Sequence, residues 1–339
     1  MVWRRWLVNV KELIRRVNHT LKLHKLFPEH SRILIACSGG PDSMALLHLL
    51  QDIAAHRHTK YKLGIAVVDH SIRPESKDEV LWLQNQVDAL GLSFYTTTFD
   101  VPTLSKDLKL SEETVGRQVR YQWLNEIAHS EGYDYIAVAH HKNDQAESIL
   151  AHLIRGTGLN GLTGMAVVSN DYDIPVIRPL LDVTKAELLA YLADRKLTYC
   201  IDSTNDDIRY QRNRIRHRII PELESINPNV VDAIARLGGS GSEDLAVISD
   251  LTVQAFKRLV TIDKGEMRLS RRALRKEPLA IQRRLWQRLV SSIDSDITLT
   301  TAHQEQLLDI VNTGEAKTFT IKSIKVIAQC DTIKVYCKH

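Results

Sequence analysis

The sequence contains few cysteines and no long apolar run. Its 339 residues include only Cys37, Cys200, Cys330 and Cys337, and no two of them form a CxxC pair. This argues against a disulfide framework and against a cysteine-rich zinc site, and it fits a reducing compartment. No segment approaches the roughly 20 apolar residues of a membrane span. We therefore expect a cytoplasmic protein without membrane contact. The basic, amphipathic start lacks the apolar core of a secretory signal, and a transit peptide is the alternative there.

Net charge is also small, at +4, but the basic residues are unevenly distributed. Residues 209–218 contain five arginines and no acid, and residues 267–290 contain eight basic residues against one acid, Glu277. Such stripes can neutralise the phosphates of a nucleic acid. The alternative is a pair of solvated helix faces.

Short apolar segments alternate with helical periodicity through the first half of the chain. The predicted strands are 32–37, 61–70, 92–100 and 134–141. The predicted helices are 11–26, 44–56, 76–90, 112–131 and 143–155. This alternation predicts an α/β fold: a doubly wound, mainly parallel sheet with helices on both faces.

The pattern changes after about residue 220. Residues 228–260 and 278–312 have helical periodicity, broken by the Gly-Gly-Ser-Gly-Ser stretch at 238–242, and short strands follow. At this length about two domains are expected. We place an N-terminal catalytic domain at 1–221 and a smaller C-terminal domain, helical and then β-rich, at 222–339.

The first predicted strand ends in the motif Ser-Gly-Gly-Pro-Asp-Ser at 38–43. Adjacent glycines let a backbone approach phosphate closely, and the following helix offers unpaired N–H groups and the positive end of its dipole. The chain contains no GxxxxGK[ST], and the 38–43 motif is not GxGxxG either, which disfavours a Walker A loop and a dinucleotide site here. An ordinary capped turn is the alternative. The position at the end of a parallel strand favours a phosphate-binding loop.

Further motifs follow the other strands. VDHSIRPES (68–76) ends the second strand and AHHKNDQAES (139–148) ends the fourth. Because parallel strands end at one edge of a sheet, we expect these motifs and the 38–43 loop to face one cleft. A glycine-rich segment, GTGLNGLTGM (156–165), comes next, and DSTN (202–205) precedes YQRNRIR (210–216).

Taken together, these motifs resemble the tRNA(Ile)-lysidine synthase family of the PP-loop, or N-type ATP pyrophosphatase, superfamily. The resemblance covers residues 30–221 most strongly. It implies that ATP is cleaved between its α- and β-phosphates and that Mg²⁺ takes part. It also implies that L-lysine is joined to C2 of cytidine 34 in the CAU anticodon of tRNA(Ile), through an adenylated cytidine. Asn143 stands where the family often has an acid.

The candidate site residues follow from the motifs and from this resemblance. Those expected to bind ATP are Ser38, Gly39, Gly40, Pro41, Asp42, Ser43 and His70, with Arg73 beside them. Those expected to act in catalysis are Asp42, Arg120 and His140. Those expected to hold lysine are Asp144 and Glu147, because acids three apart share one helix face, and Asp42, whose role the resemblance implies. Those expected to contact nucleotide or tRNA are Arg212, Arg216, Arg283 and Arg284, with Trp286.

Two other functions remain open. A PP-loop tRNA thiolase also activates a base with ATP, but it needs a sulfur-transferring cysteine or an iron–sulfur cluster, and Cys200 is the candidate cysteine. A non-catalytic nucleic-acid-binding relative would keep the basic stripes without using the loop motifs. The number and ligands of metal ions stay open, although the resemblance implies that Asp42 faces the bound amino acid or a metal. The oligomeric state also stays open, with a homodimer as one candidate.

Overall fold

The computed structural model describes residues 10–56, 60–71, 75–201, 211–263 and 265–338. The chain forms two compact units, Met1–Gly239 and Ser240–His339. The division lies later in the chain than the predicted 221/222 boundary. The reason is a small cluster in which Ile215, Ile220 and Val231 pack on Ala146, so that residues after 221 belong to the first unit. No helix among the described residues is long and apolar enough to cross a membrane.

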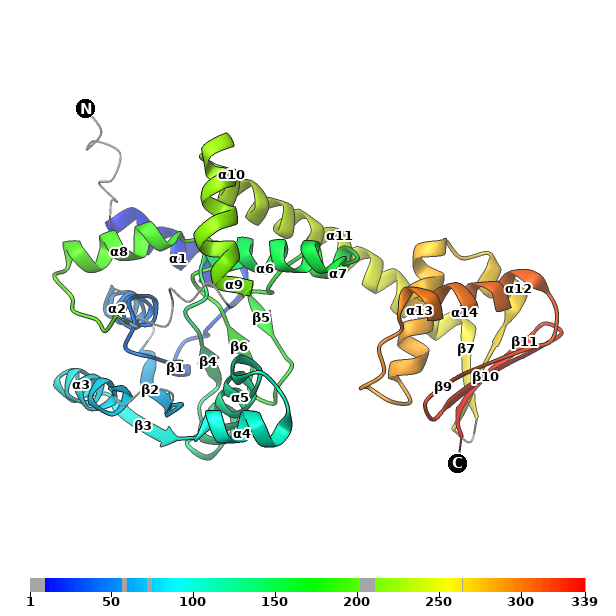
Figure 1. Cartoon of the computed structure of the whole chain (residues 1–339), viewed down its shortest axis with the longest axis horizontal. Helices are drawn as coiled ribbons and strands as arrows, with labels where there is room; N and C mark the ends of the chain where they lie inside the picture. Colours follow the sequence, from blue (N-terminus) through cyan, green and yellow to red (C-terminus); the bar gives the residue numbers. More distant parts are fainter. Residues whose placement is uncertain (1–9, 57–59, 72–74, 202–210, 264, 339) are drawn as a thin grey trace. The chain divides into compact units, whose positions relative to one another are not determined.

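The first unit is built on a six-stranded sheet in the order β3-β2-β1-β4-β6-β5 (Figure 1). Its strands are β1 Arg32–Ala36, β2 Lys62–Asp69, β3 Ser93–Thr98, β4 Tyr135–Ala137, β5 Val168–Ser169 and β6 Val176–Ile177. Neighbouring strands are parallel, apart from the antiparallel β5–β6 pair at one edge. The predicted doubly wound, mainly parallel sheet is confirmed.

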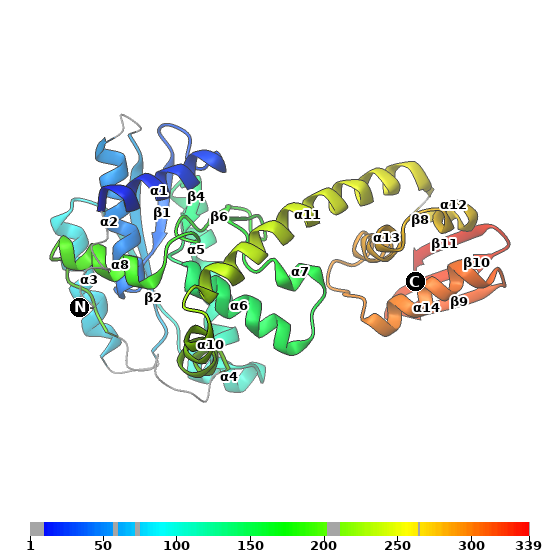
Figure 2. The ribbon, with the colours of Figure 1, turned by 90° about the horizontal axis from the view of Figure 1, so that it is seen from above.

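Helices cover both faces of this sheet because side chains alternate along its strands. Ile33 and Ile35 of β1 face one core, and Leu34 faces the other. The first core is closed by α1 (Val10–Leu23), α2 (Pro41–His56), α3 (Ser76–Ala89) and α8 (Lys185–Asp194) (Figure 2). The second is closed by α5 (Glu112–Ser130), which buries Tyr121, Leu124 and Ala128.

The first unit contains further helices in the segments that connect or follow its strands. They are α4 Val101–Leu108, α6 Lys142–Arg155, α7 Leu159–Leu162, α9 Gln211–Arg214, the π-helix η3 Ile215–Ile219 and α10 Ile220–Ile226. Helix α6 begins within the AHHKNDQAES motif (139–148), with His141 as its N-cap. The sequence did not predict α4, α8 or the short strands β5 and β6.

The predicted helix break at residues 238–242 is wrong. Helix α11 (Val230–Leu259) runs through all five residues without interruption. A Cβ on Gly238 would lie 2.8 Å from Cδ1 of Ile149 and 3.1 Å from the carbonyl oxygen of Thr163. Gly238 therefore lets α11 approach α6 and the segment after α7 closely, and it does not end the helix.

The second unit contains a five-stranded sheet in the order β7-β8-β11-β10-β9, with every neighbouring pair antiparallel. Its strands are β7 Val260–Asp263, β8 Glu266–Ser270, β9 Lys317–Ile321, β10 Ile324–Gln329 and β11 Thr332–Cys337. Its helices are α12 Arg271–Arg275, α13 Leu279–Ser291 and α14 Thr301–Thr313, so the predicted 278–312 helix is two helices. The mixed helical and β-rich second domain is confirmed, with strands β7 and β8 between helices α11 and α12.

Candidate active site

In the sheet of the first unit, the order in which the chain adds strands reverses between the neighbouring strands β1 and β4. From β1 the chain goes on to β2 on one side, and from β4 it goes on to β5 and β6 on the other. Open α/β sheets bind ligands at such a point, beyond the carboxyl ends of the strands. A cavity of about 590 Å³ lies there. Its walls include Ser38, Asp42, Ser43, His70, Arg120, His140, Asp144, Lys185, Cys200 and Arg216. The structure thus brings the three strand-end motifs to one cleft.

The loop between β1 and α2 is shaped by its two serines. Oγ of Ser43 accepts a hydrogen bond from the backbone N–H of Ser38 at 3.2 Å and donates one to the carbonyl oxygen of Gly40 at 3.0 Å. Gly39 has φ +77°, a left-handed conformation that favours glycine, and its carbonyl oxygen accepts from the N–H of Cys200 at 2.9 Å. The loop leads directly into the N-terminus of the 16-residue helix α2.

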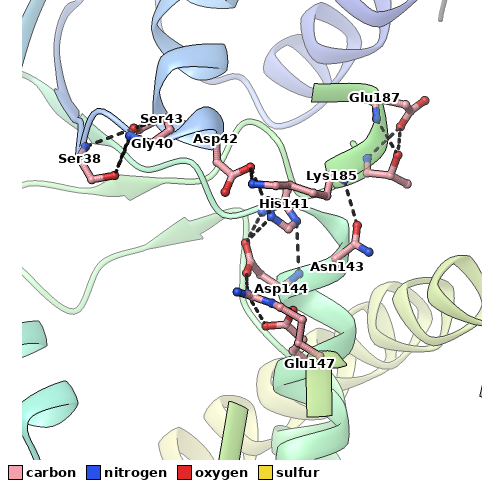
Figure 3. Close-up of polar contacts among 12 residues, drawn as sticks. Ser38, Gly40, Asp42, Ser43, His141, Asn143, Asp144, Glu147, Lys185 and Glu187 are labelled. Atoms are coloured by element: carbon pink, nitrogen blue, oxygen red, sulfur yellow. Dashed lines mark hydrogen bonds and ion pairs between the residues drawn. The ribbon is translucent and has the colours of Figure 1, made fainter. Parts of the chain in front are cut away.

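Asp42 lies in the first turn of α2 and has two cationic or polar neighbours. Its Oδ1 lies 2.6 Å from Nζ of Lys185 and 3.7 Å from Nε2 of His141 (Figure 3). Burial raises the pKa of Asp42, but His141 and Lys185 outweigh burial and hold the pKa below its ordinary value. The group is therefore a carboxylate, and it lies next to the backbone of the Ser38–Ser43 loop. Lys185 was not predicted from the sequence.

Asp144 and Glu147 do project from one face of α6, and two arginines meet them there. Arg212 donates to Oδ1 of Asp144 at 2.7 Å and to Oε2 of Glu147 at 2.8 Å. Arg216 donates to Oε1 of Glu147 at 2.6 Å and approaches Oδ1 of Asp144 at 3.3 Å. Two acids and two bases therefore form one cluster with no net charge.

The two acids of this cluster have different positions. Asp144 lines the cavity, whereas Glu147 lies behind it with 1% of its side chain exposed. Burial opposes ionisation of Asp144, but His141 and Arg212 outweigh burial, so the pKa of Asp144 is below its ordinary value. Asp144 is the acid that a ligand can reach, and Glu147 holds the two guanidinium groups in place.

Two histidines in the cavity wall are neutral at physiological pH. Burial and then Arg120 lower the pKa of His70 to about 4. Burial, followed by Arg178, Arg212 and Arg117, lowers the pKa of His140 to about 3 despite the opposing charge of Asp144. Nδ1 of each ring is buried and has no hydrogen-bond partner in the described part of the chain. Buried polar atoms are normally paired, so these two nitrogens mark where a ligand is expected to bind.

The low pKa of His140 predicts a pH-dependent stability. An unfolded histidine takes up a proton below about pH 6.5, whereas folded His140 does so only near pH 3, so stability falls as the pH drops through this window. Between pH 7.5 and pH 5, wild type should lose up to about 2 kcal/mol more than His140→Gln. Thermal unfolding of both proteins at the two pH values measures this difference. His19→Gln, at an exposed site, is the control and should behave like wild type. Equal losses in wild type and His140→Gln would contradict the assignment.

The candidate RNA-contacting residues of the second unit have partners within the protein itself. Nη2 of Arg283 lies 2.6 Å from Oε1 of Glu305, and Arg284 donates to the carbonyl oxygen of Ala280 at 3.3 Å. Trp286 is 0% exposed and belongs to the core of the unit. The expectation that Trp286 contacts RNA is therefore wrong, because the apolar face of α13 points inward.

Some sequence predictions fall outside the described residues: Arg73 and the DSTN motif at 202–205. Among residues missed by the sequence reasoning, Lys185 matters most. Its signal was the pair Thr184 and Glu187, which form a capping box and so predict a helix that begins at Lys185. Asn143 was noted only as a departure from a family pattern, yet its Oδ1 accepts from the N–H of Lys185 at 3.0 Å.

The comparison with known proteins identifies the family. A family model of the PP-loop domain matches residues 10–223. A tRNA(Ile)-lysidine synthase from Thermosipho africanus is 38% identical over 246 residues, which cover 72% of this chain and 56% of the relative. One from Nostoc sp. is 32% identical over 313 residues, covering 87% of this chain and 86% of the relative. The chain belongs to the tRNA(Ile)-lysidine synthase family of PP-loop proteins. It spans about half the length of the first curated relatives it matches.

A solved structure has a fold similar to that of this chain. The U34-tRNA thiolase NcsA from Methanococcus maripaludis with its [4Fe-4S] cluster matches with a TM-score of 0.58 and 20% identity, covering 68% of this chain and 78% of that one. At this identity the match concerns the fold alone.

The cysteines of the first unit are Cys37 and Cys200. Cys37 is buried, and burial raises the pKa of its thiol.

Proposed function

We propose that this protein joins L-lysine to C2 of cytidine 34 in the CAU anticodon of tRNA(Ile), with conversion of ATP to AMP and pyrophosphate. The proposal depends on one observation: Ser38, Ser43, His140 and Asp144 line the same cavity. A phosphate site and an amino-acid site in one cavity are what such a ligation needs. Membership of the lysidine synthase family supports the choice of substrates.

The nucleotide half of the site would be the loop at the start of α2. Its backbone N–H groups and the two serine hydroxyls can donate to phosphate oxygens, and the helix dipole favours their negative charge. In the first step the cytosine O2 attacks the α-phosphate and pyrophosphate leaves. Charge then builds on phosphate oxygens, where fixed donors lower the barrier most. Arg120 lines the same cavity and suits phosphate because its guanidinium donates in a planar fork.

Asp42 would be the residue that holds Mg²⁺. The ion is typically bound by one or two carboxylates together with substrate phosphates, and Asp42 is an ionised carboxylate next to the phosphate loop. Bound there, Mg²⁺ would neutralise charge on the leaving pyrophosphate. Asp42 would thus orient the triphosphate, while Ser38 and Ser43 hold it in the loop.

The cluster of Asp144, Glu147, Arg212 and Arg216 would bind the amino-acid end of lysine. Free lysine carries an α-ammonium and an α-carboxylate, and the cluster offers both an acid, Asp144, and a base, Arg216, to the cavity. Such pairing leaves the ε-amine of lysine free to attack C2. Glu147 would act indirectly, by holding Arg212 and Arg216. The neutral rings of His70 and His140 can hydrogen-bond an uncharged base edge, which suits adenine or the extruded cytosine.

The tRNA backbone would meet the outer side of the segment that carries Arg212 and Arg216. Arg214 and Arg218 belong to this segment and are exposed, whereas Arg212 and Arg216 turn toward the acids. Arg283 and Arg284 of the second unit remain candidates for further phosphate contacts. Basic side chains on phosphates release counterions, so affinity falls as salt rises.

Reversing the charges of Arg214 and Arg218 should lower the affinity for tRNA. It should also reduce the dependence of that affinity on salt. For Arg214→Glu with Arg218→Glu we expect tRNA affinity to fall at least roughly 10-fold at low salt, and the slope of log affinity against log salt to decrease by about 1–2. Filter binding at several salt concentrations measures both. ATP affinity, measured in parallel, should stay unchanged. A wild-type tRNA affinity that does not respond to salt would contradict the proposal.

The overall reaction is tested with ATP, labelled lysine and tRNA(Ile) bearing the CAU anticodon. Lysine-dependent AMP formation with label in the RNA is the expected result. Substituting cytidine 34 by uridine should abolish it. Sulfur-dependent modification without lysine incorporation would favour a thiolase, and tRNA binding without turnover would favour a non-catalytic relative.

A further inference from the structure

Lys185 stands at an unfavourable place for a cation. It is the first residue of α8, and a positive charge there opposes the helix dipole. The helix start is nevertheless firmly fixed. Thr184 and Glu187 form a capping box, and Asn143 of α6 accepts from the N–H of Lys185 at 3.0 Å. The backbone of Lys185 is therefore held in place while its side chain, 34% exposed, reaches into the cavity.

The partner of Lys185 is the one carboxylate expected to bind Mg²⁺. Nζ of Lys185 lies 2.6 Å from Oδ1 of Asp42, and Figure 3 shows the two side chains pointing toward one another beside His141. Mg²⁺ and Lys185 would compete for Asp42. An incoming nucleotide with Mg²⁺ supplies a new partner for each of them: the metal for Asp42, and phosphate oxygens for the ammonium.

From this arrangement we infer that Lys185 is a phosphate-binding residue: it leaves Asp42 when Mg²⁺ and ATP bind and donates to the β- and γ-phosphates. In a Walker A loop a lysine within the loop itself reaches these phosphates. The Ser38–Ser43 loop contains no lysine. The cation would come instead from α8, on the flexible four-carbon stem that lets a lysine follow its ligand. The inference rests on the nucleotide half of the proposed function and not on lysine transfer to tRNA.

Binding of ATP and of AMP to the full-length protein, without tRNA or lysine, tests this role. AMP lacks the β- and γ-phosphates, so a residue that contacts those groups affects ATP alone. For Lys185→Gln we expect the Kd of ATP with Mg²⁺ to rise about 10–100-fold, as for the loss of charge-assisted hydrogen bonds. The Kd of AMP should change less than about 3-fold, and Lys185→Arg should keep most of the ATP affinity.

Lys142 provides a matched control. It too is the first residue of a helix, α6, and it forms an ion pair of 2.6 Å, but with Asp232 on α11. Lys142→Gln should leave the Kd of ATP within about 3-fold of wild type. Thermal unfolding of each variant shows whether it is folded. If Lys185→Gln unfolds, Lys185→Arg and Lys185→Met are compared by the same ratio of AMP to ATP affinity.

A double variant separates phosphate binding from simple neutralisation of Asp42. If Lys185 only cancels the charge of Asp42, then Asp42→Asn with Lys185→Gln should restore the ATP affinity lost in Lys185→Gln. We expect no such recovery. Recovery, equal weakening of ATP and AMP, or unchanged ATP binding in Lys185→Gln would each overturn the inference. The binding measurements contain no lysine and no tRNA. They therefore test the role of Lys185 even if the protein does not transfer lysine to tRNA.

Discussion

Replacing Asp42 with asparagine is expected to lower the rate of tRNA-dependent pyrophosphate release about 10³-fold, equivalent to about 4 kcal/mol of transition-state stabilisation. The substitution keeps the size of the side chain but removes its charge. The Mg²⁺ that would neutralise the leaving pyrophosphate then loses its carboxylate ligand. Release of pyrophosphate from labelled ATP in a single turnover measures the step directly.

Asp52 supplies the control for this experiment. It lies on the same helix, α2, and accepts a hydrogen bond from the hydroxyl of Tyr191 at 2.9 Å, among residues that do not line the cavity. Asp52→Asn should keep pyrophosphate release within about 3-fold of wild type. Adenylation by Asp42→Asn at a rate near wild type would exclude Asp42 as a metal-holding residue.

Replacing Glu147 with alanine should damage both stability and lysine use. Glu147 is buried and accepts hydrogen bonds from both Arg212 and Arg216. Breaking a fully buried pair costs about 3–5 kcal/mol, and we expect about 2–3 kcal/mol here because the two arginines are about one-third exposed. For a unit of this size that corresponds to a fall in Tm of roughly 4–12 °C.

The functional effect of the same change should concern lysine alone. With Arg212 and Arg216 released, the KM for lysine should rise at least about 10-fold while the Kd of ATP stays near wild type. Asp144→Ala should raise the KM for lysine as well, because Asp144 faces the cavity. Glu224→Ala, at an exposed site on α10, is the control for both stability and kinetics. Unchanged lysine kinetics in Asp144→Ala and Glu147→Ala would remove the amino-acid site from α6.

The sheet and the position of the site were predictable because they follow from local patterns. Apolar β-branched segments such as 32–37 alternate with helices, and parallel strands must end at one edge. The sequence alone therefore predicted that the Ser38–Ser43 loop and His140 lie at one cleft. The residues at that cleft are close in space because the topology leaves them no other arrangement.

What could not be predicted depends on contacts between distant segments. Gly238 looked like a helix breaker, but its missing side chain serves the close approach to Ile149. The spacing of Arg212 and Arg216 indicated a shared helix face, without showing that Asp144 and Glu147 would meet it. Lys185 has no motif of its own.

The most direct measurement follows the α-phosphate of ATP in the absence of lysine. With labelled ATP and tRNA(Ile), we expect pyrophosphate to be released and the label to become attached to cytidine 34. Adding lysine should then release labelled AMP and leave lysine on the same base. Label found on lysine, or pyrophosphate released only after lysine is added, would contradict the activation of the tRNA base in this cavity.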